Sequence, residues 1–131
     1  MEVCDPVTND GEALACTCAH VADDRKAEKI VVLHVEPLTF VADYFVIATG
    51  LNERQLDAIV TQVRNRAHEI GHRVIGVEGG PESGWVLIDL GDVVVHVFNP
   101  EARRLYDLEL LWGEAEHVAW EDVPPLEAAR P

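Results

Sequence analysis

The chain has 131 residues, 48% of them hydrophobic and 26% charged, which fits one soluble globular domain and excludes a disordered or fibrous protein. Its 24 acidic and 10 basic residues give a formal net charge of -14, which argues against nucleic-acid binding led by phosphate contacts, because each such contact needs a cation. No apolar run approaches the roughly 18–20 residues of a membrane span, and the N-terminus lacks the pattern of a secretory signal, so we expect a cytosolic protein without membrane contact.

The residue pattern of the N-terminal half predicts two strands between two helices. The segments expected, in order, are a loose leader at 1–9, a helix from Asp10 to Glu28, a buried strand at 30–35, a turn at 38–43, a strand at 44–50 and a helix at 53–70. The last helix has the clearest pattern, because Asn52 and Gln55 form a capping-box pair at its start and Gly71 supplies its stop. Its polar face carries three arginines, which we interpret as a solvated surface: Arg54, Arg64 and Arg66.

The C-terminal half predicts further strands and one short helix. The segments expected are a strand at 73–77, a Gly/Pro loop at 78–84, strands at 85–90 and 93–98, a helix at 101–111 with leucines available for packing, and an acidic, flexible tail at 113–131. Gly91 and Asp92 suit a two-residue turn, so the strands beside them should pair as an antiparallel hairpin. The pattern as a whole predicts a single α/β domain at 10–112: a mixed, largely five-stranded sheet flanked by helices, with a C-terminal antiparallel hairpin.

The three cysteines all lie within the first eighteen residues: Cys4, Cys16 and Cys18. Their odd number does not fit a disulfide framework. Cys16 and Cys18, with His20, could nominally bind zinc, but the spacing is not that of a C-x-x-C pair and no second pair of ligands follows. We therefore expect reduced thiols and no metal site.

The two faces of the predicted hairpin differ in chemistry, because side chains alternate along a strand. One face is aliphatic and must belong to the core: Val86, Ile88, Leu90, Val93, Val95 and Val97. The other face mixes aromatic, ionisable and aliphatic groups: Trp85, Leu87, Asp89, Val94, His96 and Phe98. Either a helix of the same chain covers this second face, with Asp89 and His96 hydrogen-bonded beneath it, or the face meets a partner. The alternation alone does not decide between the two.

The charges around the hairpin favour a protein partner. No Lys or Arg occurs between Val74 and Ala102, whereas five acidic residues do: Glu78, Glu82, Asp89, Asp92 and Glu101. The resulting negative potential suits a basic protein. Burial of Trp85 alone removes about 150–250 Å² from water, which is worth roughly 4–6 kcal/mol as an upper bound. We expect the affinity to rest on the aromatic side chains and the acidic groups to act mainly on the encounter rate.

An enzymatic interpretation uses the same carboxylates. Asp89 and Asp92, with Asp43 or Glu78 nearby, could hold Mg²⁺ as in a nucleotidyltransferase-like enzyme or a nucleotide-binding protein. The chain has no Gly-rich phosphate loop followed by a Lys, no basic group near the hairpin to hold a triphosphate, and no Ser or Cys visibly placed beside a base. We therefore favour a non-catalytic protein without a cofactor and keep the nucleotide-binding function as the alternative.

Four blocks of the chain carry a resemblance to a known family. In order they are "KAEKIVVLHV", "ADYFVIATGLNERQLDAIV", "GVEGGPESGWVLIDLGDVVVHVF" and "ARRLYDLELLW". They run from Lys26 to Trp112 and resemble successive blocks of the ribosomal silencing factors of the Iojap family. The resemblance implies a protein that is not an enzyme, that binds the large ribosomal subunit at its ribosomal protein fourteen, and that blocks joining of the small subunit. Translation then falls, typically when nutrients are scarce.

The resemblance also implies where the partner binds. It places the family's ribosome-facing surface on the stretch from Trp85 through Asp89, with a contribution from the last block. Combined with the hairpin face, it predicts seven partner-binding residues: Trp85, Leu87, Asp89, His96, Phe98, Tyr106 and Glu109. The first strand carries His34 where the family usually has an acidic residue, so no role is assigned there. A homodimer formed through the same face competes for these residues.

Overall fold

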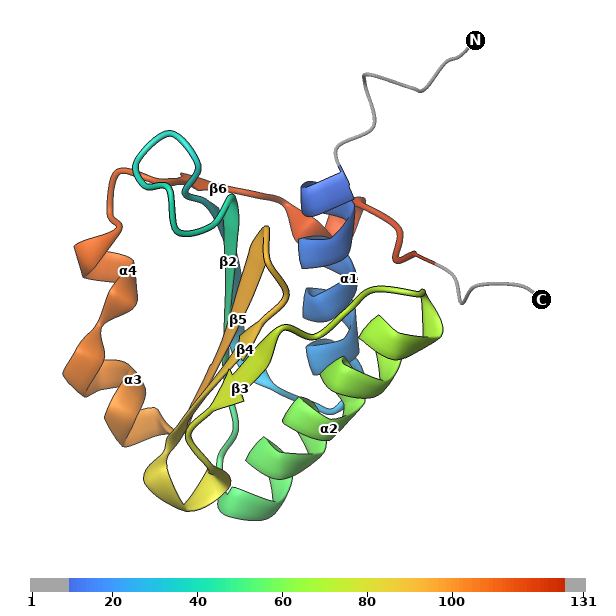
Figure 1. The fold of residues 1–131 in the computed structure, drawn as a ribbon. Coiled ribbons are helices and arrows are strands. Elements are labelled where there is room, and N and C mark those ends of the chain that lie inside the picture. Colours follow the sequence, from blue (N-terminus) through green and yellow to red (C-terminus); the bar gives the residue numbers. More distant parts are fainter. Residues whose placement is uncertain (1–9, 127–131) are drawn as a thin grey trace, which may run out of the picture.

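Six strands form one mixed sheet with helices on both faces (Figure 1). The computed structural model describes residues 10–126. Its helices are α1 (Asp10–Asp24), α2 (Glu53–Glu69), α3 (Pro100–Tyr106) and α4 (Leu108–Leu111). Its strands are β1 (Glu28–His34), β2 (Tyr44–Thr49), β3 (Gly76–Glu78), β4 (Trp85–Asp89), β5 (Val93–Phe98) and β6 (Glu116–His117). The strand order β3-β4-β5-β2-β1-β6 confirms the predicted α/β class and adds one short strand to the five expected.

The parallel pair β2 and β5 forms the centre of the sheet, with β1 and β4 antiparallel to them on either side. Every residue of β2 and β5 is buried. These strands consist mainly of β-branched and aromatic side chains, which fit a pleated and covered surface. A strand buried on both faces requires packed elements on both sides of the sheet.

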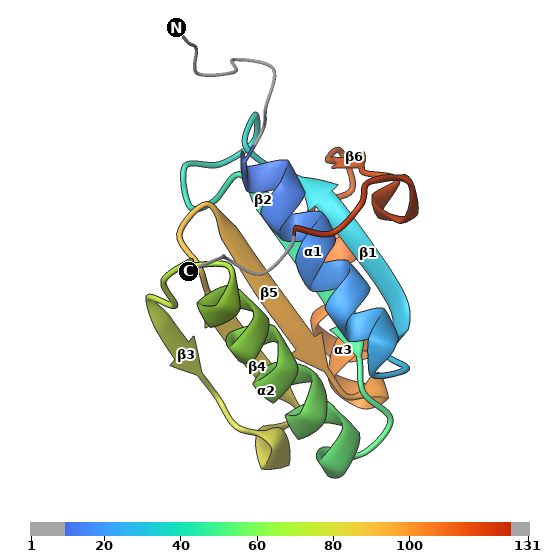
Figure 2. The same ribbon diagram turned by 90° about the vertical axis from the view of Figure 1, so that its right-hand side faces the viewer.

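Helices α1 and α2 lie side by side over one face of the sheet (Figure 2). The core beneath them includes the aliphatic face of the hairpin, and all six residues predicted for that face are buried. The hairpin register is also the predicted one, with Trp85 opposite Phe98 and Leu87 opposite His96. Gly91 adopts a positive φ of 92° in the turn, a conformation that favours glycine.

The predicted caps of α2 are confirmed. The Asn52 side chain accepts a hydrogen bond from the backbone N–H of Gln55 at 2.8 Å. The Gln55 side chain reaches back to the N–H of Leu51 at 2.7 Å, one residue before the N-cap. Gly71 follows the helix with a φ of 80°, the left-handed conformation that commonly ends a helix.

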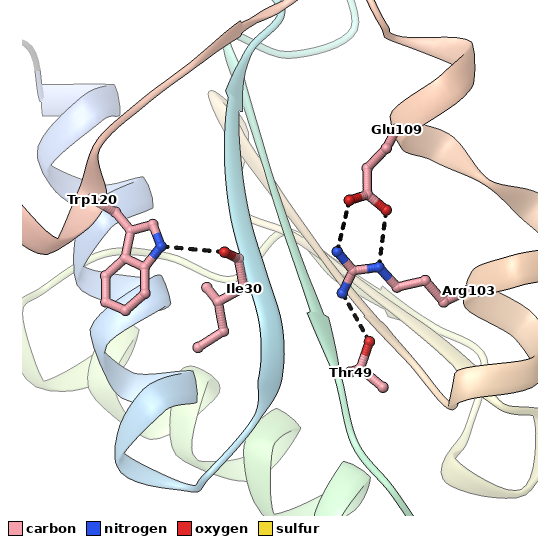
Figure 3. Close-up of polar contacts among 5 residues, drawn as sticks. All are labelled: Ile30, Thr49, Arg103, Glu109 and Trp120. Carbon is pink, nitrogen blue, oxygen red and sulfur yellow. Dashed lines mark hydrogen bonds and ion pairs between the residues drawn. The ribbon is translucent and has the colours of Figure 1, made fainter.

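The short helices α3 and α4 cover part of the opposite face and are held there by Arg103, which is 7% exposed (Figure 3). Its Nε and Nη2 atoms each donate to the Glu109 carboxylate at 3.0 Å. Its Nη1 atom donates to the Thr49 hydroxyl at 2.8 Å. One guanidinium therefore joins α3, α4 and the central strand β2, and the two-pronged pairing with a carboxylate is the strong form of this interaction.

The predicted helix at 101–111 is two helices, because Asp107 takes the left-handed conformation with a φ of 44°. This break turns the last helical segment, so Glu109 faces Arg103. The leucines predicted to pack inward do not all do so, since Leu105 and Leu111 are 75% and 70% exposed. Leu108 packs against the core.

Two other boundaries differ from the prediction. Helix α1 ends at Asp24 and not near Glu28, because the chain turns back through Lys26, which has a positive φ of 66°, to enter β1. Strand β3 covers Gly76–Glu78 in place of 73–77. Its partner β4 ends at Asp89, so the backbone before Ile75 has no strand to pair with.

The segment predicted as a flexible tail is part of the fold up to residue 126. Strand β6 pairs with β1, and Trp120 is 9% exposed in the core between β1 and α1. The Trp120 indole N–H donates to the Ile30 carbonyl at 3.3 Å (Figure 3). The N–H of Leu126 donates to the Thr17 hydroxyl at 2.8 Å. The acidic, proline-containing composition concealed this role, and the predicted leader at 1–9 lies outside the described residues.

Cys16 and Cys18 are unpaired thiols buried on α1. Burial is the main cause that raises the pKa of Cys16 to about 11 and that of Cys18 to about 12. Both thiols are therefore protonated at neutral pH, which makes them poor nucleophiles. Across residues 10–126, no helix is long and apolar enough to span a membrane.

Replacement of Trp120 tests the packing of the C-terminal segment. We expect Trp120→Ala to lower the free energy of unfolding by about 3 kcal/mol, the usual cost of removing a buried large aromatic side chain. Trp120→Phe should cost less, because it loses the hydrogen bond to Ile30 but keeps most of the packing. The neighbouring exposed Glu121 gives the control, with Glu121→Ala changing stability by under about 0.5 kcal/mol in chemical denaturation. Equal unfolding midpoints for Trp120→Ala and the control would contradict the packing role.

A double-mutant cycle tests the bridge made by Arg103. We expect Glu109→Ala to cost about 2 kcal/mol in denaturant unfolding, because it leaves a buried guanidinium without its carboxylate. Arg103→Met keeps the aliphatic packing and removes the charge, so Glu109→Ala should cost much less in the Arg103→Met background. Additive effects of the two substitutions would show that the side chains do not interact energetically.

Candidate partner-binding site

The face of the hairpin that points toward α3 is only partly covered. Trp85 and Leu87 on β4 remain half-buried, whereas Phe98 and His96 on β5 are buried, at 1% and 5% exposure. Tyr106, the last residue of α3, lies against Trp85 with ring centroids 4.5 Å apart and is 48% exposed. The same indole stacks on Phe98 at 5.1 Å. The aromatic side chains thus form a stack that starts in the core and ends at the surface.

A hollow of about 290 Å³ opens where this stack reaches the surface. We call it the Trp85 surface, and it is lined by Glu78, Gly79, Ser83, Trp85, Leu87 and Tyr106. Its floor is aromatic and aliphatic, its one charged group is a carboxylate, and no basic side chain lines it. This combination favours a ligand with apolar groups at its centre and positive charge at its edge.

The loop between β3 and β4 shapes the rim of the hollow. Gly79 and Gly84 both have positive φ values, and a Cβ on Gly79 would stand 2.2 Å from the Trp85 carbonyl oxygen. Only glycine permits this close approach. The loop is tied to α3 through Asn99, whose N–H donates to the Gly84 carbonyl at 2.8 Å and whose side chain caps the helix at Ala102. The position of Tyr106 is therefore linked to that of Trp85 through backbone contacts.

His96 lies behind Trp85 and not on the surface. The Trp85 indole N–H donates to His96 Nδ1 at 3.2 Å, so the ring proton of the neutral imidazole is on Nε2. Nε2 is buried and has no hydrogen-bond partner within the described part of the chain. Burial lowers the pKa of His96 to about 4, which keeps the ring neutral at physiological pH. The ring also meets the edge of Phe45 at 5.0 Å between centroids.

The structure brings together three of the seven predicted partner-binding residues at the Trp85 surface: Trp85, Leu87 and Tyr106. His96 and Phe98 lie beneath it, because both point into the layer covered by α3 and α4. Glu109 is engaged by Arg103, and its side chain is 36% exposed. Asp89 is partly exposed, and its carboxylate accepts the N–H of Gly91 at 2.8 Å in the hairpin turn.

The prediction missed the exposed leucines next to Tyr106. Leu105, Leu110 and Leu111 are each at least 70% exposed on α3 and α4. A single continuous helix at 101–111 would have left Leu105 and Leu111 available for packing, together with Leu108. Such a concentration of exposed leucines on two short helices marks an interaction surface more often than an ordinary solvated one.

The residues considered for the enzymatic alternative include Asp89, whose carboxylate makes a local contact, and Asp43 and Asp92, which are joined through their backbones. Asp89 caps the turn, and the backbone N–H of Asp43 donates to the Asp92 carbonyl at 2.8 Å. Burial, then the neighbouring Asp92 and Glu36, raise the pKa of Asp43. Within residues 10–126 no three His, Cys, Asp or Glu side chains are placed to hold a metal ion together.

Comparison with known proteins extends these observations. The family model described as "Ribosomal silencing factor during starvation" matches residues 8–131. The ribosomal silencing factor of Bacillus subtilis is 47% identical over 97 residues, which cover 74% of this chain and 82% of that protein. A mouse protein named "Mitochondrial assembly of ribosomal large subunit protein 1" is 35% identical over 89 residues, covering 66% of this chain and 39% of its own length.

A solved structure agrees with the fold. The crystal structure of a protein from Chromobacterium violaceum matches with a TM-score of 0.74 and 37% identity, over 76% of this chain and 83% of that chain. The resemblance carried by the four sequence blocks is thereby confirmed. The family model spans residues 8–131, and the Bacillus subtilis protein is 47% identical over a segment that covers 82% of its length, so the chain belongs to the family of ribosomal silencing factors.

Proposed function

We propose that this protein represses translation by binding the large ribosomal subunit through ribosomal protein fourteen and sterically preventing its association with the small subunit. The single observation that carries the proposal is the Trp85 surface, a half-exposed aromatic stack with an acidic edge. The name of the mouse relative supports the large subunit as the target. The description of the family supports a silencing role under starvation.

The chemistry of the Trp85 surface fits a basic protein partner. Trp and Tyr contribute most to binding energy when they are held rigidly and then fully desolvated. Trp85 is held by its stack on Phe98 and by its hydrogen bond to His96, so little freedom is lost on binding. The exposed leucines of α3 and α4 extend the apolar area, and Glu78 at the rim attracts basic groups.

The buried residues of the predicted set support the surface without touching the partner. His96 and Phe98 set the position of the indole from below. Arg103 and Glu109 hold α4 against α3 and so position the leucines. A steric block requires no chemical step, because it needs only a protein bound over the face where the small subunit joins. A rigid contact surface supported by buried residues is sufficient for such binding.

Subunit joining tests the proposal directly. We expect a stoichiometric excess of the protein, added to separated subunits, to reduce the 70S-sized peak on sucrose gradients and to sediment with the large subunit. Unchanged joining at saturating protein would refute the steric mechanism. Loss of joining without sedimentation on the large subunit would place the target elsewhere.

Two substitutions at the Trp85 surface test the contact residues. We expect Trp85→Ala and Tyr106→Ala each to weaken binding to isolated ribosomal protein fourteen by about 2 kcal/mol or more, roughly 30-fold, as for central aromatic residues in other interfaces. Tyr106 is the safer site, because it is half exposed and its loss disturbs the core less.

The matched control is Leu51→Ala, since Leu51 is 52% exposed and lies outside the Trp85 surface. Binding of each variant to isolated ribosomal protein fourteen is measured by titration calorimetry, and Leu51→Ala should bind with the affinity of the unaltered chain. Light scattering on all variants separates self-association: if Tyr106→Ala abolishes a dimer but binds ribosomal protein fourteen normally, the surface serves two copies of the chain and the proposed contact is wrong.

The supporting role of His96 predicts a pH dependence of stability. The pKa of about 4 in the folded protein lies below the ordinary value of 6.5, so the unfolded chain binds more protons between these two values. The free energy of unfolding should therefore fall as the pH decreases from about 6.5 toward 4, by at most about 3 kcal/mol from this group. His96→Gln retains an acceptor for Trp85 but does not titrate, so its denaturation profiles should lose part of this dependence. Parallel pH profiles of the two proteins would contradict a buried neutral His96.

A further inference from the structure

A second hollow, of about 430 Å³, lies on the outer side of α2 and has the opposite charge from the rest of the molecule. Its lining is basic and neutral: Thr61, Arg64, Asn65, His68, His72, Arg73 and Val74. No carboxylate lines it, although the chain carries a net charge of -14. The arginines of this helix were predicted to form a solvated face, and the fold places His72 and Arg73, from the segment after Gly71, beside Arg64 in the lining of the hollow.

The two arginines of this hollow are candidates for binding an external group. Within residues 10–126, neither Arg64 nor Arg73 makes an ion pair. Two other arginines do form ion pairs: Arg66 pairs with Glu69 at 3.2 Å, and Arg103 with Glu109 at 3.0 Å. The chain has more than twice as many acidic as basic residues, yet within residues 10–126 these two arginines, which line the same hollow, are in no ion pair and are available for an external anion.

The basic hollow and the Trp85 surface lie on opposite faces of the sheet but beside the same edge. Val74, which lines the basic hollow, lies two residues before the start of β3, and Glu78, which lines the Trp85 surface, ends β3. Figures 1 and 2 show β3 at the edge of the sheet next to α2. A large partner that covers this edge can therefore contact both hollows at once.

We infer that the hollow formed by Arg64, His68, His72 and Arg73 binds phosphate groups of an RNA backbone, namely ribosomal RNA next to the protein contact on the large subunit. The inference rests on the proposed function. Guanidinium groups suit phosphate because their planar donors pair with two oxygens. Asn65 and Thr61 add neutral hydrogen-bonding groups.

The site does not read base sequence. No aromatic side chain on which an unpaired base could stack lines the hollow, apart from the two imidazoles. The contact is therefore to the backbone, which positions a protein without specifying a sequence. Because the chain as a whole is strongly acidic, a phosphate contact at this hollow would orient the bound protein with this face toward the RNA.

The test compares a variant of the hollow with a charge-matched control. Arg64→Ala/Arg73→Ala removes both unpaired guanidinium groups. Arg25→Ala/Arg54→Ala removes the same charge from exposed positions outside the hollow, and Arg54 lies about 15 Å from Arg64 along the helix axis. Arg64→Lys/Arg73→Lys keeps the charge, and chemical denaturation of each variant verifies folding. Binding of each full chain to isolated large subunits is measured by co-sedimentation at several salt concentrations.

We expect Arg64→Ala/Arg73→Ala to bind more weakly at low salt, with a slope of log affinity against log salt that is shallower by about 1.5, since each phosphate contact contributes about 0.7–0.9. The control should match the unaltered chain, and the Lys variant should retain most of the slope. Binding to isolated ribosomal protein fourteen, which contains no RNA, should be the same for all variants.

Two results would overturn the inference while the proposed function stands. One is that Arg64→Ala/Arg73→Ala binds large subunits with the affinity and salt slope of the control. The other is that it loses affinity equally for isolated ribosomal protein fourteen, which would make the hollow a protein contact. If the unaltered chain itself fails to sediment with large subunits, the proposed function fails and the inference about ribosomal RNA fails with it.

Discussion

The structure depends on the need to cover a central strand pair on both sides. Strands β2 and β5 run parallel and are buried at every residue, so apolar layers must pack against both faces of the sheet. Two long helices supply one layer. The other layer is made from two helices of seven and four residues, which are too short to cover it fully. Trp85 and Leu87 reach the surface in the part of this face that the short helices leave uncovered. The candidate binding site therefore exists because helices cover one face of the sheet more completely than the other.

The short layer needs a polar connection because its apolar contacts are few. Arg103 provides it by bridging Glu109 and Thr49, and the left-handed Asp107 lets α4 turn so that Glu109 can reach the guanidinium. The same turn exposes Leu110 and Leu111. The left-handed turn at Asp107 thus both allows the ion pair that stabilises α3 and α4 and leaves the leucines of α4 exposed. The C-terminal segment completes the opposite layer through Trp120, which packs in that core and donates to the Ile30 carbonyl of β1.

Charge is distributed unevenly over this scaffold. Acidic residues are concentrated around the hairpin, whereas two arginines and two histidines line the hollow on the outer side of α2. A protein with an apolar, acid-edged surface on one side of an edge strand and a basic hollow on the other is suited to a partner made of both protein and RNA. Membership of the ribosomal silencing factors is consistent with a partner of that composition.

The sequence by itself determined the local features whose physics is short-range: the cap of α2 by Asn52 and Gln55, the turn at Gly91, the alternation that sends Val86 and Ile88 into the core, and the α/β class. The alternation along β4 also placed Trp85 and Leu87 on one face of the hairpin, whereas Tyr106 was predicted only through the family resemblance. Tertiary structure alone decided which groups the second hairpin face leaves exposed. His96 and Phe98 alternate with the same period as Trp85, and only the packing of α3 buries them. Three further features also depend on the tertiary structure: the partner of Glu109, the role of Trp120 and the hollow lined by both Arg64 and Arg73. Each arises where elements that are separate in the sequence meet, or where a turn reorients the chain. The periodicity of residue types along the chain does not encode such contacts.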